Sequence, residues 1–331
     1  MTAPLHPIRD TRLAASLKNP LRSLAKAREL ALLLLIVAIM IVMSVISPNF
    51  LTPANFRAFT IGLAPTAIIS VGMTVLLVSG GFDLSVGSVL ALSGTVAAML
   101  MLHGVPISVA VLLTLVLGVA VGIANGWLVT KVGVNPLVAT LGTMSVARGA
   151  ALVLTDGFSI SGLPDAFGYV GSASVSGVPM IVLIMLVVVA IGDVALRHSR
   201  YLRQVYYIGA NENAAKLSGI FVDRVRTVAY ALTSVLAALS GILLASRLDA
   251  GTPTAGNALE LQVLAAAVIG GARLGGGAGT VLGAFLGVVF VGLINNAMTM
   301  LQVSALWQMV VTGVILVAAV ALDRVLQRRA A

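Results

Sequence analysis

Long apolar runs separated by short polar or glycine-rich breaks repeat along most of the chain. A helix that crosses a bilayer needs about 20 apolar residues, and fewer where it is broken. Ten segments fit, and we expect each to form a span, near residues 29–47, 61–79, 84–102, 105–128, 137–155, 178–196, 228–246, 259–271, 279–296 and 304–322. The pattern predicts an all-α polytopic membrane protein with some broken or re-entrant helices.

Bulk composition supports lipid as the solvent of this chain. Of its 331 residues, 59% are hydrophobic and 9% charged, too much apolar surface for a soluble globule. A net charge of +9 is compatible with nucleic-acid binding. The basic residues, however, sit at span ends without interleaved aromatics, so we expect no nucleic-acid partner. The chain has no cysteine and three scattered histidines, and we expect neither a metal nor a cofactor.

The lysines and arginines predict the topology. With the N-terminus inside, seventeen fall in inside segments and two, Arg57 and Arg247, fall outside. We therefore expect an inner-membrane protein with both termini cytoplasmic. The expected parts are a tail over 1–28, a single transmembrane domain over 29–323 and a tail over 324–331.

The longest polar segment between spans is Tyr201 to Arg226, within a predicted cytoplasmic loop over 197–227. Residues 211–219 favour a short helix that stops at a glycine, with Glu212 and Lys216 four apart and able to pair. An apolar strip of Ala214, Leu217, Ile220 and Phe221 lies beside that pair. A solvated loop is the plain alternative. The docking interpretation assigns contact with a partner to Glu212, Asn213, Ala214, Ala215, Lys216, Leu217 and Gly219.

A polar, glycine-rich turn joins the second and third spans. It carries Gly80, Gly81, Asp83 and Ser85 between apolar runs too close for an ordinary loop, so it must be buried or line a cavity. Asp83 and Ser85 can also simply cap the next helix. Residues 78–90 weakly resemble residues 269–282, which suggests two related halves with both turns on the same side, a parallel repeat.

Further polar groups lie in or beside the spans. Asn125 and Asn135 fall near the inner ends of spans four and five, although Asn135 before a proline is most simply a turn and helix start. Arg148 lies past the midplane, where it can snorkel, bond a carbonyl or face a pathway. Small residues of span five, at Ala139, Gly142, Ser145 and Gly149, predict close helix packing.

The last third of the chain adds three candidates. A broken helix near 262–271 would place Glu260 at the outer mouth. Asn295 and Asn296 near the outer face can bind hydroxyl groups, or bond between helices. The candidate pathway or gate thus comprises Gly80, Gly81, Asp83, Ser85, Asn125, Asn135, Arg148, Glu260, Asn295 and Asn296.

Residues 155–177 form the longest outside loop, either a partner surface or a plain solvated loop.

The loop sequence IGANENAAKLSGI resembles the cytoplasmic loop of the ribose-permease family, the sugar-type permeases of bacterial ATP-binding-cassette importers. GGFDLSVGS at residues 80–88, NPLVATLGTMSVARG at 135–149, LAAAVIGGARLGGGAGTVLG at 264–283 and INNAM at 294–298 recur in that family. The family usually has an acid where Gln262 stands, so a charged role at that position is in doubt.

The resemblance implies a permease subunit that imports a monosaccharide. Its expected partners are a cytoplasmic ATPase, a periplasmic sugar-binding protein and a second permease subunit, either an identical copy or a sister. The absence of a phosphate-loop motif agrees with ATP hydrolysis in a separate subunit, so the chain itself is no enzyme. The alternatives are an ion- or proton-coupled secondary transporter, a permease for another small polar solute such as a nucleoside, and a membrane enzyme.

Overall fold

The computed structural model describes residues 20–330, so residues 1–19 of the predicted N-terminal tail lie outside the described part. The described chain is almost entirely helical. The long helices are α1 (Pro20–Ile46), α2 (Pro53–Val78), α3 (Val86–Leu102), α4 (Ile107–Trp127), α5 (Pro136–Leu154), α7 (Met180–His198), α10 (Val222–Leu248), α12 (Val281–Met300) and α13 (Ala305–Ala330). The shorter ones are the π-helix η1 (Leu128–Val132), α6 (Asp165–Ser172), α8 (Gln204–Ala210), α9 (Glu212–Leu217) and α11 (Leu259–Ile269).

Each of the ten predicted spans corresponds to one apolar helix. Seven described helices are long and apolar enough to cross a membrane, and three apolar segments are shorter: α3, α11 and Leu306–Ala318 of α13. The predicted all-α polytopic fold is confirmed. The helix boundaries differ at the ends of the chain, because α1 begins at Pro20 and α13 continues to Ala330, inside the predicted tails.

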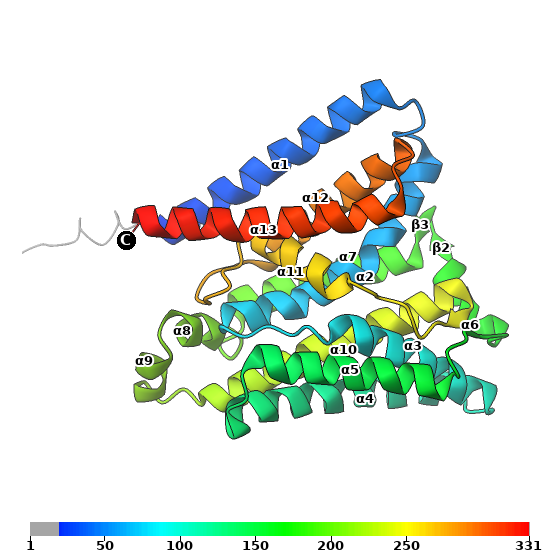
Figure 1. The fold of residues 1–331 in the computed structure, drawn as a ribbon, viewed down its shortest axis with the longest axis horizontal. Helices are drawn as coiled ribbons and strands as arrows, with labels where there is room; N and C mark the ends of the chain where they lie inside the picture. Colours follow the sequence, from blue (N-terminus) through cyan, green and yellow to red (C-terminus); the bar gives the residue numbers. More distant parts are fainter. Residues whose placement is uncertain (1–19, 331) are drawn as a thin grey trace, which may run out of the picture.

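The helices run roughly lengthwise between two ends of the molecule (Figure 1). α8 and α9 lie at one end, and the start of α1 and the end of α13 lie toward this same end. α6 and the short strands lie at the opposite end. Because the start of α1 and the end of α13 lie toward the same end, the chain passes between the two ends an even number of times, as the sequence predicts.

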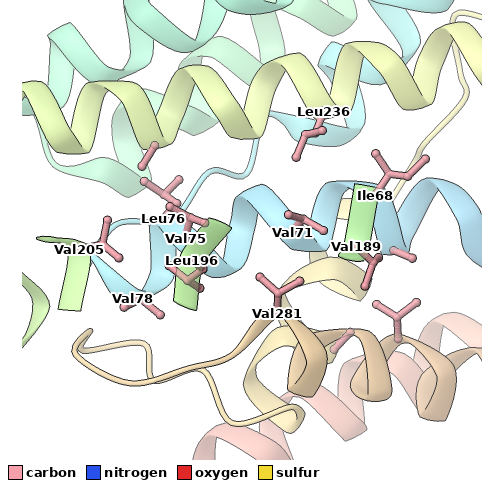
Figure 2. Close-up of a cluster of buried hydrophobic side chains, with 14 of the residues drawn as sticks. Ile68, Val71, Val75, Leu76, Val78, Val189, Leu196, Val205, Leu236 and Val281 are labelled. Atoms are coloured by element: carbon pink, nitrogen blue, oxygen red, sulfur yellow. The ribbon is translucent and has the colours of Figure 1, made fainter. Parts of the chain in front are cut away.

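A long α2 and a long α10 form the centre of the packing. Figure 2 shows apolar side chains of α2, among them Ile68, Val71 and Leu76, between residues of four other helices. The surrounding residues are Val189 and Leu196 of α7, Val205 of α8, Leu236 of α10 and Val281 of α12. Ala215 of α9 and Ala266 of α11 also belong to this cluster, so it holds seven helices together, among them α8 and α9 of the polar loop.

α4 packs on α10 through glycines four residues apart. A Cβ on Gly122 would lie 2.5 Å from Ala231 Cα, and one on Gly126 would lie 2.7 Å from Thr227 Cα. Backbones this close gain dispersion contacts that lipid cannot replace. The predicted small-residue packing of span five is wrong for Gly142 and Gly149 of α5, where an added Cβ meets nothing within 4 Å.

The predicted outside loop 155–177 is ordered by contacts with α10. Strand β1 (Ile160–Ser161) pairs antiparallel with β4 (Ala250–Gly251), and β2 (Ser174–Val175) pairs with β3 (Val178–Pro179). The Ser246 hydroxyl donates to Phe167 O at 2.5 Å and accepts from Gly171 N at 2.9 Å. α6 is therefore fixed to the end of α10.

Candidate functional site

The predicted short helix of the polar loop is α9. Asn211 caps its start, since its side-chain oxygen accepts from Ala214 N at 3.0 Å. Gly219 ends it with φ +80°, and two bonds close the end: Gly219 N to Lys216 O and Ile220 N to Ala215 O. This pair of bonds is a Schellman motif, which needs a left-handed residue where glycine alone has no Cβ penalty.

One face of α9 and the residue after its turn present bare apolar side chains. Leu217 is 91% exposed and Phe221 is 67% exposed, while Ala215 is buried against the protein. Asn213 and Ala214 are also exposed. Arg224 lies over the Phe221 ring at 4.9 Å. Leu217 and Phe221 are four residues apart, one before and one after the Gly219 turn.

Glu212 is held from two sides. Lys216 Nζ donates to its Oε1 at 2.7 Å, the predicted pair, and Arg226 Nη2 donates to its Oε2 at 3.0 Å. These hydrogen bonds, that of Lys216 first, hold the pKa of Glu212 below its ordinary value. The carboxylate is 40% exposed, so screening limits what each pair contributes to stability.

Arg226 lies on α10, and its side chain connects α9 with the turn that follows α2. The same Nη2 donates to Ser79 O at 3.0 Å, and the side chain is only 16% exposed. Its Nε is buried with no partner among the described residues. One turn further along α10, the Tyr230 hydroxyl donates to Phe82 O at 3.2 Å. Two residues of α10 therefore hold residues 79–82 from the side of the polar loop.

Asp83 closes that turn and is fully buried. Its Oδ1 accepts from Ser85 N at 2.8 Å and from Ser85 Oγ at 2.6 Å, while Oδ2 lies 3.4 Å from both Asn125 Nδ2 of α4 and Ser234 Oγ of α10. Thr143 of α5 donates to Asn125 Oδ1 at 2.5 Å. The carboxylate therefore joins the start of α3 to α4 and α10, and reaches α5 through Asn125, which is more than a helix cap does.

The Ser85 side chain makes no capping bond to α3. The predicted cap at this residue is wrong, because its hydroxyl is taken by Asp83. Gly80 has φ +83°, so the turn favours glycine there, and a Cβ on Gly81 would lie 2.9 Å from Leu76 Cδ1. Gly80, Gly81, Asp83, Ser85 and Asn125 thus form one site.

The two segments that resemble each other in sequence meet in space. Gly277 N donates to Val78 O at 2.8 Å, and a Cβ on Gly276 would lie 2.8 Å from Gly209 Cα of α8. Tyr206 of α8 donates to Gly279 O at 2.7 Å, and burial raises the pKa of Tyr206 to about 12. The turns after α2 and α11 therefore lie at the same end, as a parallel repeat requires, and α8 packs on both.

The remaining candidates lie elsewhere. Asn135 caps α5 by accepting from Leu137 N at 2.9 Å, the simple reading of that residue. Asn296 exchanges hydrogen bonds with Asn55 of α2 at 2.8 and 3.2 Å, which is the interhelical alternative, and the neighbouring Asn295 side chain is half-buried. Arg148 donates to Pro253 O at 2.7 Å and to Ala255 O at 2.8 Å, so it bonds carbonyls.

Glu260 is not at the outer mouth. A Cβ on Gly87, near the start of α3, would collide with its carboxylate. Gly87 lies fifteen residues from the outer end of α3 at Leu102, which is about 22 Å along the helix. The prediction is wrong because the chain between β4 and α11 enters the membrane as irregular backbone and α11 begins deep inside.

The sequence analysis does not predict four contacts of this site. They are Arg226 with Ser79, Tyr230 with Phe82, Thr143 with Asn125, and the packing of α8. Val205 and Ile208 of α8 are 0% and 2% exposed, and their spacing of three was a signal of a buried helix face.

Comparison with known proteins gives consistent matches. Residues 55–320 match the family described as "Branched-chain amino acid transport system / permease component". The chain is 40% identical over 288 residues to the ribose import permease protein RbsC of Bacillus subtilis (strain 168), covering 86% of this chain and 89% of the relative.

Two relatives of Escherichia coli (strain K12) also match over most of their length. The D-allose transport system permease protein AlsC is 38% identical, covering 86% of this chain and 87% of the relative. The L-arabinose transport system permease protein AraH is 33% identical, covering 91% and 92%. No solved structure matches the chain. By its apolar helices and these matches, this multi-pass membrane protein belongs to the family of transport-system permease components.

Proposed function

We propose that this chain is the membrane subunit of an ATP-binding-cassette importer that carries a monosaccharide inward. A separate cytoplasmic ATPase drives it, a periplasmic binding protein delivers the sugar, and a second permease subunit completes the complex. The names of the ribose, D-allose and L-arabinose permeases support a pentose or hexose as the solute.

The observation that carries the proposal is the exposed apolar surface of α9 joined to the core. Leu217 and Phe221 are bare, while Glu212 on the same helix is bound to Arg226 and, through it, to Ser79. A partner that binds Leu217 and Phe221 is therefore linked, through Glu212, Arg226 and Ser79, to the turn that carries Asp83. Single exposed apolar side chains are common, as Phe158 at the opposite end shows, so the support here is that two of them lie four residues apart in one loop.

The topology supports the side on which the ATPase docks. α8, α9 and the turn after α11 lie at one end of the molecule, and the basic residues of the sequence are concentrated in the segments assigned to that end (Figure 1). On this proposal that end is cytoplasmic, as are both termini.

The proposal is tested by co-purification of the chain with its cytoplasmic ATPase subunit. Leu217→Asp and Phe221→Asp are expected to lower the amount of ATPase recovered, because each buries a charge in the contact. Phe158→Asp is the matched control, since Phe158 is 77% exposed in the loop at the opposite end. Equal recovery with all three variants contradicts docking at α9.

A further inference from the structure

Between β4 and α11 the chain runs through the membrane without helical structure. A Cβ on Gly251 would lie 3.1 Å from Thr95 Cα, and one on Gly256 would lie 2.8 Å from Gly87 O. Residues 251–256 therefore follow α3 from the level of Thr95 to that of Gly87. Because α3 rises 1.5 Å per residue, the segment reaches about 22 Å below the outer end of that helix.

One side of this segment is fixed to the protein. Arg148 Nη1 of α5 donates to Pro253 O at 2.7 Å and to Ala255 O at 2.8 Å, and Pro253 is buried. Ala258 has φ +59°, a left-handed value for a residue with a side chain, directly before α11 begins. The irregular path is therefore imposed by specific contacts.

The other side is open and polar. Thr254 and Asn257 are exposed, Gln262 is half-exposed, and none of the three side chains hydrogen bonds to a described residue. Irregular backbone and unpaired amides are unfavourable against hydrocarbon, because lipid cannot supply the hydrogen bonds that water supplies. This polar face is thus unfavourable in contact with lipid, whereas the exposed apolar faces of α4 and α7 at similar depth are favourable there.

We propose that Thr254, Asn257 and Gln262 line the water-filled path along which a neutral polyhydroxylated solute crosses the membrane. This inference rests on the proposed function and names the surface that serves it. The second permease subunit supplies the opposite wall.

The chemistry of the three side chains suits such a solute. A hydroxyl and two carboxamides both donate and accept, as sugar hydroxyls do, so either orientation of a hydroxyl can be satisfied. The Arg148 guanidinium is occupied by two carbonyls on the protein side, the Glu260 carboxylate lies against Gly87 of α3, and Gln262 brings no charge. A surface of this kind passes a neutral solute without holding it tightly.

The test uses the absence of cysteine from the chain. Thr254→Cys and Asn257→Cys are placed in the full complex in membranes and treated with the anionic reagent methanethiosulfonate ethylsulfonate, which modifies only a hydrated thiol. Val116→Cys is the control: Val116 is 55% exposed on α4 and lies about 14 Å along that helix from Ile107.

We expect both path variants to react at least tenfold faster than Val116→Cys. The reaction is measured with reagent on one membrane side without ATP and with reagent on the other side during turnover, and fast reaction under either condition meets the expectation. Reaction from neither side, at the rate of Val116→Cys, overturns the inference. The labelling needs no transport, so failure of the proposed function is seen separately: hydrated thiols in a protein that imports no sugar contradict the function and not the path.

Discussion

Arg226 Nη2 lies 3.0 Å from Glu212 Oε2 of α9 and also 3.0 Å from Ser79 O at the end of α2. One nitrogen thus bonds both the helix with the bare apolar surface and the turn that leads to Asp83. Arg226 and Glu212 are 14 residues apart in the sequence, whereas Ser79 is 147 residues from Arg226. The contact therefore connects α9 directly to the turn that precedes Asp83.

Arg226→Gln is expected to uncouple the ATPase while leaving it bound. α9 keeps its cap and its exposed residues, so the ATPase should still co-purify. Stimulation of ATP hydrolysis by the loaded binding protein should fall about fivefold or more, since coupling free energies between sites run to about 1–3 kcal/mol.

Glu212→Gln tests the same connection from its other end. It should show a milder loss, and the double variant should be no worse than Arg226→Gln alone. Arg203→Gln, an exposed arginine just before α8, is the matched control. Unchanged stimulation in Arg226→Gln would show that this contact transmits nothing.

Gly219→Val should impair docking without impairing insertion. Gly219 has φ +80°, so a branched side chain costs roughly 1–2 kcal/mol of backbone strain, but it meets nothing within 4 Å and no clash with the chain's own atoms arises. The variant should insert and purify normally and recover less ATPase. Wild-type transport by Gly219→Val would refute the role assigned to this turn.

How far the sequence predicts the structure differs between local and distant contacts. α9, its cap at Asn211 and its stop at Gly219 follow from neighbouring residues, and all were predictable. The ten apolar segments followed from composition along the chain. The Glu212–Lys216 pair needed only a spacing of four.

What the sequence left out depends on distant residues. Asp83 was readable as a cap because Ser85 is its neighbour, but Asn125 and Ser234 come to it from 42 and 151 residues away. Glu260 was placed at the mouth because an apolar run after a loop resembles a helix that starts at the surface. The descent of residues 251–256 along α3 depends on glycine contacts that no local pattern reveals.

Asp83→Ala should destabilise the folded protein strongly. It leaves the backbone N–H and hydroxyl of Ser85 and the hydroxyl of Ser234 without their acceptor in a site with no exposure, and each unpaired buried group costs about 1–3 kcal/mol. Asn125 Nδ2 keeps a second acceptor, Ser85 Oγ at 3.1 Å. Thermal unfolding in detergent should show a clear drop in Tm. Asp165→Ala, an exposed acid in the first turn of α6, is the control and should change little. Equal Tm values for the two variants would contradict the role of Asp83 in joining α3, α4 and α10.

Single cysteines test the proposed orientation in this cysteine-free chain. Arg57→Cys and Arg247→Cys should react with an impermeant maleimide added to intact spheroplasts. Lys131→Cys, Arg203→Cys and Arg273→Cys should react only after the membrane is opened, because the basic residues favour the cytoplasmic side. Labelling of position 203 in intact spheroplasts would invert the topology.

The most direct measurement of the whole account is uptake of radiolabelled ribose into proteoliposomes that contain this chain and its partner ATPase, with the partner binding protein outside. We predict uptake that requires ATP inside the vesicles and stops when the ATPase or the binding protein is left out; D-allose and L-arabinose tested in parallel identify the preferred solute. Uptake by this chain alone, driven by an ion gradient without ATP, would contradict it.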